Sequence, residues 1–100
     1  MKLSTIWYRA NRELTQIRGE FGSRSAKRAC AVGAIFYYDA KNPAIDDLSR
    51  YDWKDMKQEE TLLKARDVLT SAAGKSIVEL NDSEGWTFLQ FARKARSLGL

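Results

Sequence analysis

Cys30 is the strongest nucleophile in this chain of 100 residues, which contains no histidine. A reactive thiolate needs an electropositive, partly exposed setting. Lys27 and Arg28 are near in sequence, but Ala29 and Gly33 are among the small residues around Cys30, so burial as a small apolar group is the simpler expectation. The missing histidine excludes Ser-His-Asp and Cys-His triads and His-ligated zinc. A single cysteine also excludes a four-cysteine metal cluster and a disulfide framework. We therefore expect no catalytic cysteine.

Carboxylates are the second chemical candidate. Glu79, Asp82 and Glu84 are close in sequence, and Mg²⁺ binds through one or two carboxylates together with waters and substrate phosphates. Helix capping explains Asn81 and Asp82 more simply, because free N–H groups and the helix dipole favour these side chains at an N-terminus. We expect no metal site and no cofactor.

Basic residues point more strongly to a function. The chain carries 17 Lys and Arg against 13 Asp and Glu, a formal net charge of +4, and the N-terminal third is the most basic part. Arg9, Arg12 and Gln16 project from the polar face of the first predicted helix, with Tyr8 at its border. An exposed tyrosine beside arginines is typical of a partner-binding surface. The alternative is that Tyr8 merely folds over a neighbouring helix end.

A second basic group, Arg24, Lys27 and Arg28, lies at the predicted N-terminus of the next helix. The helix dipole disfavours cations there, so an anionic ligand would relieve the cost. The predicted partner-binding set is Tyr8, Arg9, Arg12, Gln16, Arg24, Lys27 and Arg28.

Hydrophobic periodicity predicts four main helices that position these residues. The first runs from about Ser4 to Arg18 and ends at Gly19. Its apolar stripe consists of Leu3, Ile6, Trp7, Ala10, Leu14 and Ile17.

The second predicted helix, over residues 25–39, is apolar on every side after its first turn. Such a helix is surrounded by neighbours, so we expect it to be the central element. One side carries only small residues that would let another helix approach closely: Ala26, Ala29, Cys30, Gly33 and Ala34. A buried strand over residues 32–38 is the alternative, because a short apolar run fits both.

Asn42-Pro43 predicts a short helix through Arg50, followed by a connector over residues 51–54. A long helix then begins at Asp55 with a capping-box pattern and ends before Gly74. Its predicted core face consists of Leu62, Ala65, Val68, Leu69, Ala72 and Ala73.

Residues 76–80 are expected to be extended or a short turn. The last helix is predicted to be capped within residues 81–84 and to run to about Ser97. Its core face would consist of Phe88, Phe91, Ala92, Ala95 and Leu98. The basic side chains near its end suit the helix dipole and need no further purpose: Arg93, Lys94 and Arg96.

The predicted fold class is therefore all-α. We expect one domain over residues 1–100, a compact bundle of about four main helices around the central apolar helix at residues 26–39. Residues 76–80 are the one candidate for an extended segment.

Two short motifs resemble those of a widespread set of small bacterial and phage proteins with no established activity. Residues 30–35, Cys-Ala-Val-Gly-Ala-Ile, match a Cys-x-x-Gly-Ala-(Leu/Ile) helix. Residues 77–82 match a hydrophobic-hydrophobic-x-(Trp/Leu)-Asn-Asp segment before a C-terminal helix. The resemblance covers residues 29–96, with Leu80 where many members have tryptophan. It implies a helical fold and a phage or mobile-element context.

These patterns predict a non-catalytic protein-binding module, a phage or mobile-element accessory that modulates a host complex such as a defence system. Nucleic-acid binding through the basic N-terminal third is the alternative, and a small carboxylate- or cysteine-dependent enzyme is the second alternative. No apolar run reaches the roughly 18 residues of a membrane helix, so we expect no membrane partner. The single cysteine and the start of the chain favour a cytoplasmic location. The oligomeric state is left open.

Overall fold

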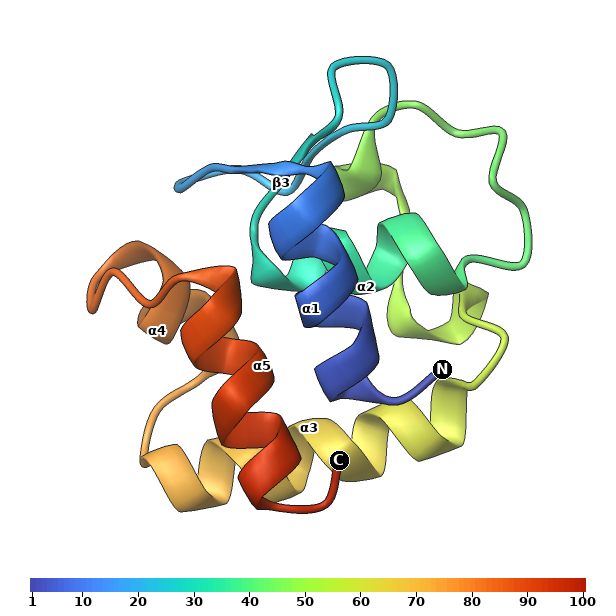
Figure 1. The fold of residues 1–100 in the computed structure, drawn as a ribbon. Helices are drawn as coiled ribbons and strands as arrows, with labels where there is room; N and C mark the ends of the chain where they lie inside the picture. The colour runs from blue at the N-terminus through green and yellow to red at the C-terminus, as the bar shows by residue number, and fades with distance from the viewer.

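A computed structural model describes all residues, 1–100, and contains five α-helices and one small sheet (Figure 1). In chain order the elements are α1 (Leu3–Glu13), β1 (Thr15–Gln16), β2 (Gly22–Ser23), β3 (Arg28–Ala29), α2 (Ala31–Asp39), η1 (Leu48–Arg50), η2 (Trp53–Asp55), α3 (Glu59–Ala73), α4 (Ile77–Asp82) and α5 (Phe88–Ser97). The elements η1 and η2 are short 3₁₀ helices. The protein is mainly helical, as predicted, but the sheet means that it is not strictly all-α.

The sheet has the order β1-β3-β2, with β1 parallel and β2 antiparallel to β3. Gly22 is required in β2 because its φ is +117° and a Cβ there would lie 2.0 Å from the Arg28 carbonyl oxygen. The three strands join the end of α1 to the start of α2.

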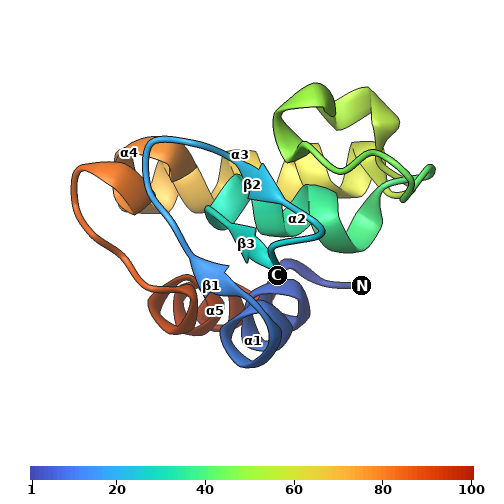
Figure 2. The same ribbon diagram turned by 90° about the horizontal axis from the view of Figure 1, so that it is seen from above.

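The helices form layers around α2, which lies between the α1–α5 pair and the α3–α4 side (Figure 2). Helices α1 and α5 run antiparallel: Ser4 N–H donates to Leu100 O at one end, and Phe88 N–H donates to Gln16 Oε1 just beyond the other. This packing brings the two ends of the sequence into one layer.

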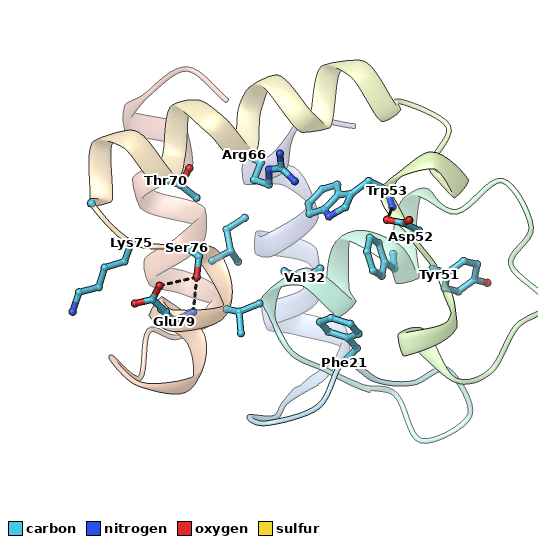
Figure 3. Close-up of a pocket in the computed structure, with 14 residues that line it drawn as sticks. Phe21, Val32, Tyr51, Asp52, Trp53, Arg66, Thr70, Lys75, Ser76 and Glu79 are labelled. Carbon is cyan, nitrogen blue, oxygen red and sulfur yellow. Dashed lines mark hydrogen bonds between the residues drawn. The ribbon is translucent and has the colours of Figure 1, made fainter.

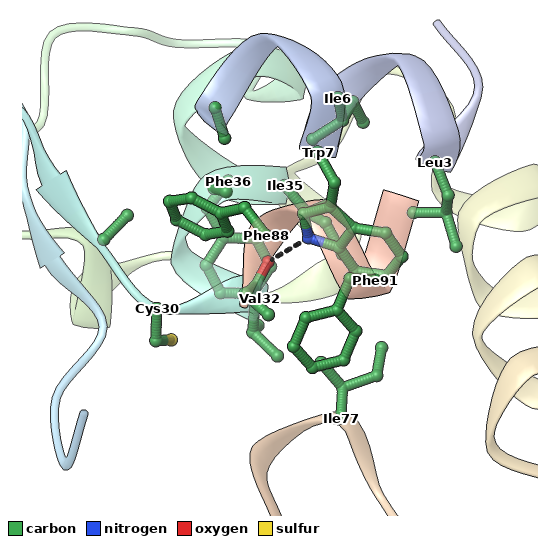
Figure 4. Close-up of a cluster of buried hydrophobic side chains, with 14 of the residues drawn as sticks. Leu3, Ile6, Trp7, Cys30, Val32, Ile35, Phe36, Ile77, Phe88 and Phe91 are labelled. Atoms are coloured by element: carbon green, nitrogen blue, oxygen red, sulfur yellow. Dashed lines mark hydrogen bonds between the residues drawn. The ribbon is translucent and has the colours of Figure 1, made fainter. Parts of the chain in front are cut away.

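The central position predicted for the apolar helix is confirmed. Residues 31–36 of α2 are all buried. The Trp7 indole N–H donates to Ala31 O at 3.0 Å, and the Trp7 ring packs 4.9 Å from the Phe91 ring (Figure 4). Trp7 therefore connects α1, α2 and α5 in the core.

The predicted first helix is too long: α1 ends at Glu13, not at Arg18. Leu14 already has extended backbone angles, and Thr15 N–H donates to Lys27 O at 2.9 Å. Pairing with a distant strand therefore overrides the helical periodicity of this segment.

The predicted helix at residues 25–39 begins later, at Ala31. Cys30 is its N-cap, and the Cys30 Sγ accepts a hydrogen bond from Gly33 N–H at 3.3 Å. Residues 24–27 form a turn between β2 and β3 instead.

The predicted short helix from Asn42 to Arg50 is wrong except for η1, because residues 42–47 form turns, bends and a bridge. The long helix begins at Glu59 rather than Asp55. The Asp55 carboxylate caps η2 instead, accepting from Asp52 N–H at 2.8 Å. The end of α3 before Gly74 is confirmed, but Val68 and Ala72 are exposed rather than in the core.

Residues 76–80 are not extended, because the Ser76 hydroxyl accepts from Glu79 N–H and caps the short helix α4. The last helix is capped by Thr87 and Gln90 rather than within residues 81–84, and its end at Ser97 is confirmed. None of the helices combines the length and the apolar character that crossing a bilayer requires.

Candidate partner interface

Arg9 and Arg12 lie where the sequence predicts them, on the side of α1 that faces away from the core, and Tyr8 lies at the border of that side, where it packs against the core. Both arginines are exposed and Tyr8 is half-buried. Arg12 makes no ion pair, whereas Arg9 Nε lies 3.1 Å from Glu13 Oε1. Arg12 is thus the cation of this helix most available to another molecule.

Glu13 is held by α2 as well as by its own helix. The Tyr38 hydroxyl donates to Glu13 Oε1 at 2.7 Å, and the Arg9 guanidinium lies 5.1 Å from the Tyr38 ring centre. The hydrogen bond from Tyr38 has the largest effect and lowers the pKa of Glu13; desolvation opposes it, and the neighbouring Arg9 and Arg12 lower the pKa further. Its carboxylate is therefore ionised and already occupied.

Helix α5 contains three basic residues that sequence reasoning assigned only to the helix dipole, and Lys94 is half-buried. Arg93 and Arg96 are exposed, and α5 lies beside α1 in the same layer (Figures 1 and 2). We use the name basic α1–α5 face for the exposed arginines of these two adjacent helices, Arg9, Arg12, Arg93 and Arg96, together with Tyr8. Glu13 is the one acid in α1, and α5 contains none.

Gln16 is turned inward rather than toward a partner. Its amide Nε2 donates to Asn81 Oδ1 at 2.7 Å and to Trp86 O at 2.8 Å, while Oε1 accepts from Phe88 N–H at 2.7 Å. These bonds join β1 to the loop before α5. We therefore leave Gln16 out of the interface.

Arg24 lies at the opposite end of α2 from the one predicted. Its guanidinium donates to Tyr37 O and Tyr51 Oη, each at 2.9 Å, and to Phe36 O at 3.3 Å. A cation is favourable beside the carbonyl groups at a helix C-terminus. The prediction of a costly cation awaiting an anion is therefore wrong for Arg24, whose role is structural.

Lys27 and Arg28 are exposed but precede the helix, in the turn and in β3. The helix-dipole argument does not hold for them either, because α2 begins only at Ala31. Arg28 and Arg18 line a hollow of about 520 Å³ together with Trp86. Arg18 belongs to no predicted site, because only the folded chain brings it beside Arg28.

The side chains considered for catalysis are each buried or engaged with a neighbour, and they do not share a site. Cys30 is 4% exposed, and burial raises the pKa of its thiol, which makes the thiolate scarce at neutral pH. Asp82 accepts from Asn81, Glu79 from Ser76, and Glu84 pairs with Lys75. No group of three or more metal-ligating side chains comes together.

The net positive charge of the chain is concentrated in α1 and α5, which carry five basic residues against one acid, whereas the rest carries twelve of each. Every acid except Glu13 and Glu20 lies within residues 39–84, outside the α1–α5 layer. The feature that stands out for recognition is thus a basic pair of helices on a remainder that carries no net charge. Comparisons with protein-family models, with curated proteins and with solved structures found no match to this chain.

Proposed function

We propose that this protein is a non-catalytic binding module that docks an acidic surface of a partner protein on its basic α1–α5 face. The observation that carries the proposal is the set of four exposed arginines on two adjacent helices whose one acid, Glu13, is already bound by Tyr38 and Arg9. A face of net positive charge attracts acidic partners and speeds their encounter. Arginine and tyrosine are also the residue types enriched where proteins bind.

The rigidity of the two helices supports the proposal. Ring packing between Trp7 and Phe91 fastens α1 to α5, and Ser4 and Leu100 are joined by a backbone hydrogen bond. A face built on fixed helices loses little conformational freedom when it binds. Half-buried Tyr8 packs against the core, so its ring is held in place before a partner arrives.

The absence of an enzymatic role is part of the proposal and rests on the poor nucleophilicity of buried Cys30. An accessory role in a phage or mobile element, acting on a host complex such as a defence system, rests on the motif resemblance alone and stays a prediction. A cytoplasmic location likewise stays a prediction.

Nucleic-acid binding is the second candidate, and one observation favours it. Arg18, Arg28 and the Trp86 ring line the same hollow at the strand end of the molecule. Arginines bind phosphates and aromatic rings stack on bases. Glu20 also lines this hollow, which weakens its attraction for a phosphate chain.

A capture experiment tests the proposal with two variants of equal net charge. In the first, Arg9, Arg12, Arg93 and Arg96 are each replaced by Gln; in the matched control, Lys41, Lys54, Lys57 and Lys64 are replaced by Gln. The immobilised proteins capture partners from a lysate of the native host cells, with and without nuclease. We expect the first variant to capture at least about ten-fold less of the partner than the wild type does, and the control to retain capture.

Two outcomes would contradict the protein-binding proposal. Equal loss in both variants would mean that only net charge matters. Loss of capture after nuclease treatment, with affinity that falls steeply as salt rises, would favour nucleic acid instead.

A further inference from the structure

A hollow of about 670 Å³ opens between α3, the start of α4 and an aromatic cluster centred on Phe36 (Figure 3). The rings of Trp53, Phe21 and Tyr51 lie 5.5, 5.9 and 6.2 Å from the Phe36 ring, and all four residues line the hollow. Its volume is in the range of ligand pockets, which are mostly apolar with a few polar groups. Seven of the 14 lining residues are hydrophobic, and the aromatic end of the hollow therefore suits a large apolar group.

A second hollow of about 650 Å³ adjoins the first, because Phe21 and Val78 line both. The second hollow is lined by the acids Glu20, Asp47 and Asp82 and by no basic residue. Val78, where the two hollows meet, is 44% exposed and is among the few large apolar side chains left open to water. We call the joined hollows the Phe21–Val78 groove.

The charge of the groove is acidic overall. Arg66 and Lys75 line the first hollow, but Arg66 pairs with Asp67 and Lys75 with Glu84. The Asp47 carboxylate accepts from the Ser49 hydroxyl at 2.7 Å, and this bond and the one from Ser49 N–H lower the pKa of Asp47. An ionised acid end beside an aromatic end is complementary to a cation beside an apolar group.

We infer that the Phe21–Val78 groove binds a segment of a partner protein in which a large apolar side chain stands near lysine or arginine. The apolar side chain enters the aromatic hollow, and the cationic group lies among Glu20, Asp47 and Asp82. The helices of the basic α1–α5 face run behind the lining residues in Figure 3. The groove is therefore a second surface, beyond the proposed function and opposite to it in charge.

Three blocked peptides serve as probes: acetyl-Phe-Gly-Lys-Lys-amide, acetyl-Ala-Gly-Lys-Lys-amide and acetyl-Phe-Gly-Glu-Glu-amide. Each is titrated into the ¹⁵N-labelled chain of residues 1–100, and the Trp53 indole and Val78 amide resonances are followed. We expect the Phe-Lys peptide to bind with a Kd of about 1 mM or tighter. We expect the other two peptides to bind at least about five-fold more weakly.

Exposed positions provide variants that leave the core intact. Val78→Gln removes the apolar wall at the junction, and Val68→Gln is its control because Val68 is 46% exposed and lies outside the groove. Glu20→Gln removes one acid, with Glu60→Gln on α3 as its control. We expect Val78→Gln and Glu20→Gln to weaken binding of the Phe-Lys peptide by about three-fold or more and both controls to leave it unchanged.

The inference is overturned if the Ala-Lys or Phe-Glu peptide binds as tightly as the Phe-Lys peptide, or if no peptide shifts Trp53 or Val78. It is also overturned if sedimentation shows the protein self-associating through the groove in a way that Val78→Gln abolishes, because the occupant would then be a second copy. The variant that lacks the four arginines of the α1–α5 face keeps peptide binding under this inference. Loss of binding at the groove is therefore distinguishable from loss of binding at the basic α1–α5 face.

Discussion

Asn81 connects three parts of the chain through one buried amide. It is 1% exposed; its Oδ1 accepts from Ala31 N–H at 3.0 Å and from Gln16 Nε2, and its Nδ2 donates to Ile17 O and to the Asp82 carboxylate. The N-terminus of α2, the strand β1 and the helix α4 therefore share a single side chain. Buried polar groups of this kind are costly to leave without partners.

Asn81→Ala removes these hydrogen bonds at once. We expect it to lower the free energy of unfolding by about 3 kcal/mol, because the buried N–H of Ala31 and the Gln16 amide lose their acceptor. Urea denaturation followed by circular dichroism measures the change. Asn11→Ala, at an exposed position of α1, is the matched control and should stay within about 0.5 kcal/mol of the wild type. An equal effect of the two substitutions would contradict the bridging role of Asn81.

Helix α2 requires a small residue, Gly33, in its first turn. The sequence predicts that the small side of this segment lets another helix approach. The Phe21 carbonyl approaches instead: a Cβ at Gly33 would lie 2.0 Å from the Phe21 oxygen, which also accepts from Cys30 N–H. Gly33 thus admits the chain that precedes β2.

Gly33→Ala should therefore be strongly destabilising. Backbone cannot move aside as the end of a flexible side chain can, so we expect a loss of about 3 kcal/mol, at the upper end of overpacking effects. Gly19→Ala is the control, because Gly19 has open space around its Cβ position and only a φ of +78° to accommodate. It should cost about 1 kcal/mol. Thermal unfolding of the two variants compares these costs, and a Gly33→Ala variant as stable as Gly19→Ala would show that the approach is not tight.

Sequence periodicity found the helices more reliably than their ends. The end of α3 before Gly74 and the end of α5 at Ser97 follow from local residues, and both are confirmed. The end of α1 depends on pairing between Thr15 and Lys27, which no local pattern reveals. The predicted cap of the last helix was wrong because it too depends on distant residues. Asn81 does not cap that helix; its side chain accepts hydrogen bonds from Gln16 in β1 and from Ala31 in α2.

The candidate interface was only partly predictable from the sequence. The exposed face of one helix follows from the periodicity of its own residues, but which helices pack side by side does not. Arg9 and Arg12 follow from the periodicity of α1, but Arg93 and Arg96 join them only through the antiparallel packing of the first and last helices. Gln16 looked exposed because its partners Asn81, Trp86 and Phe88 lie 65 to 72 residues away. Arg24 was misread because the start of α2 was misplaced.

At the level of the molecule, the fold carries two candidate binding surfaces of opposite charge. The basic α1–α5 face is proposed to meet an acidic protein, and the Phe21–Val78 groove is inferred to take a basic and apolar segment. The basic face depends on the fold, because the packing of α1 beside α5 brings residues from the two ends of the sequence into one layer.

Titration of the ¹⁵N-labelled protein with an oligoglutamate peptide tests most directly whether the basic α1–α5 face binds an acidic partner. At about 50 mM salt, where surface charges are weakly screened, we expect shifts concentrated in α1 and α5 and in the side chains of Arg12, Arg93 and Arg96. We expect these shifts to fade at about 500 mM salt. Shifts that spread over α3 and the groove, or that persist when the four arginines are replaced by glutamine, would contradict the account.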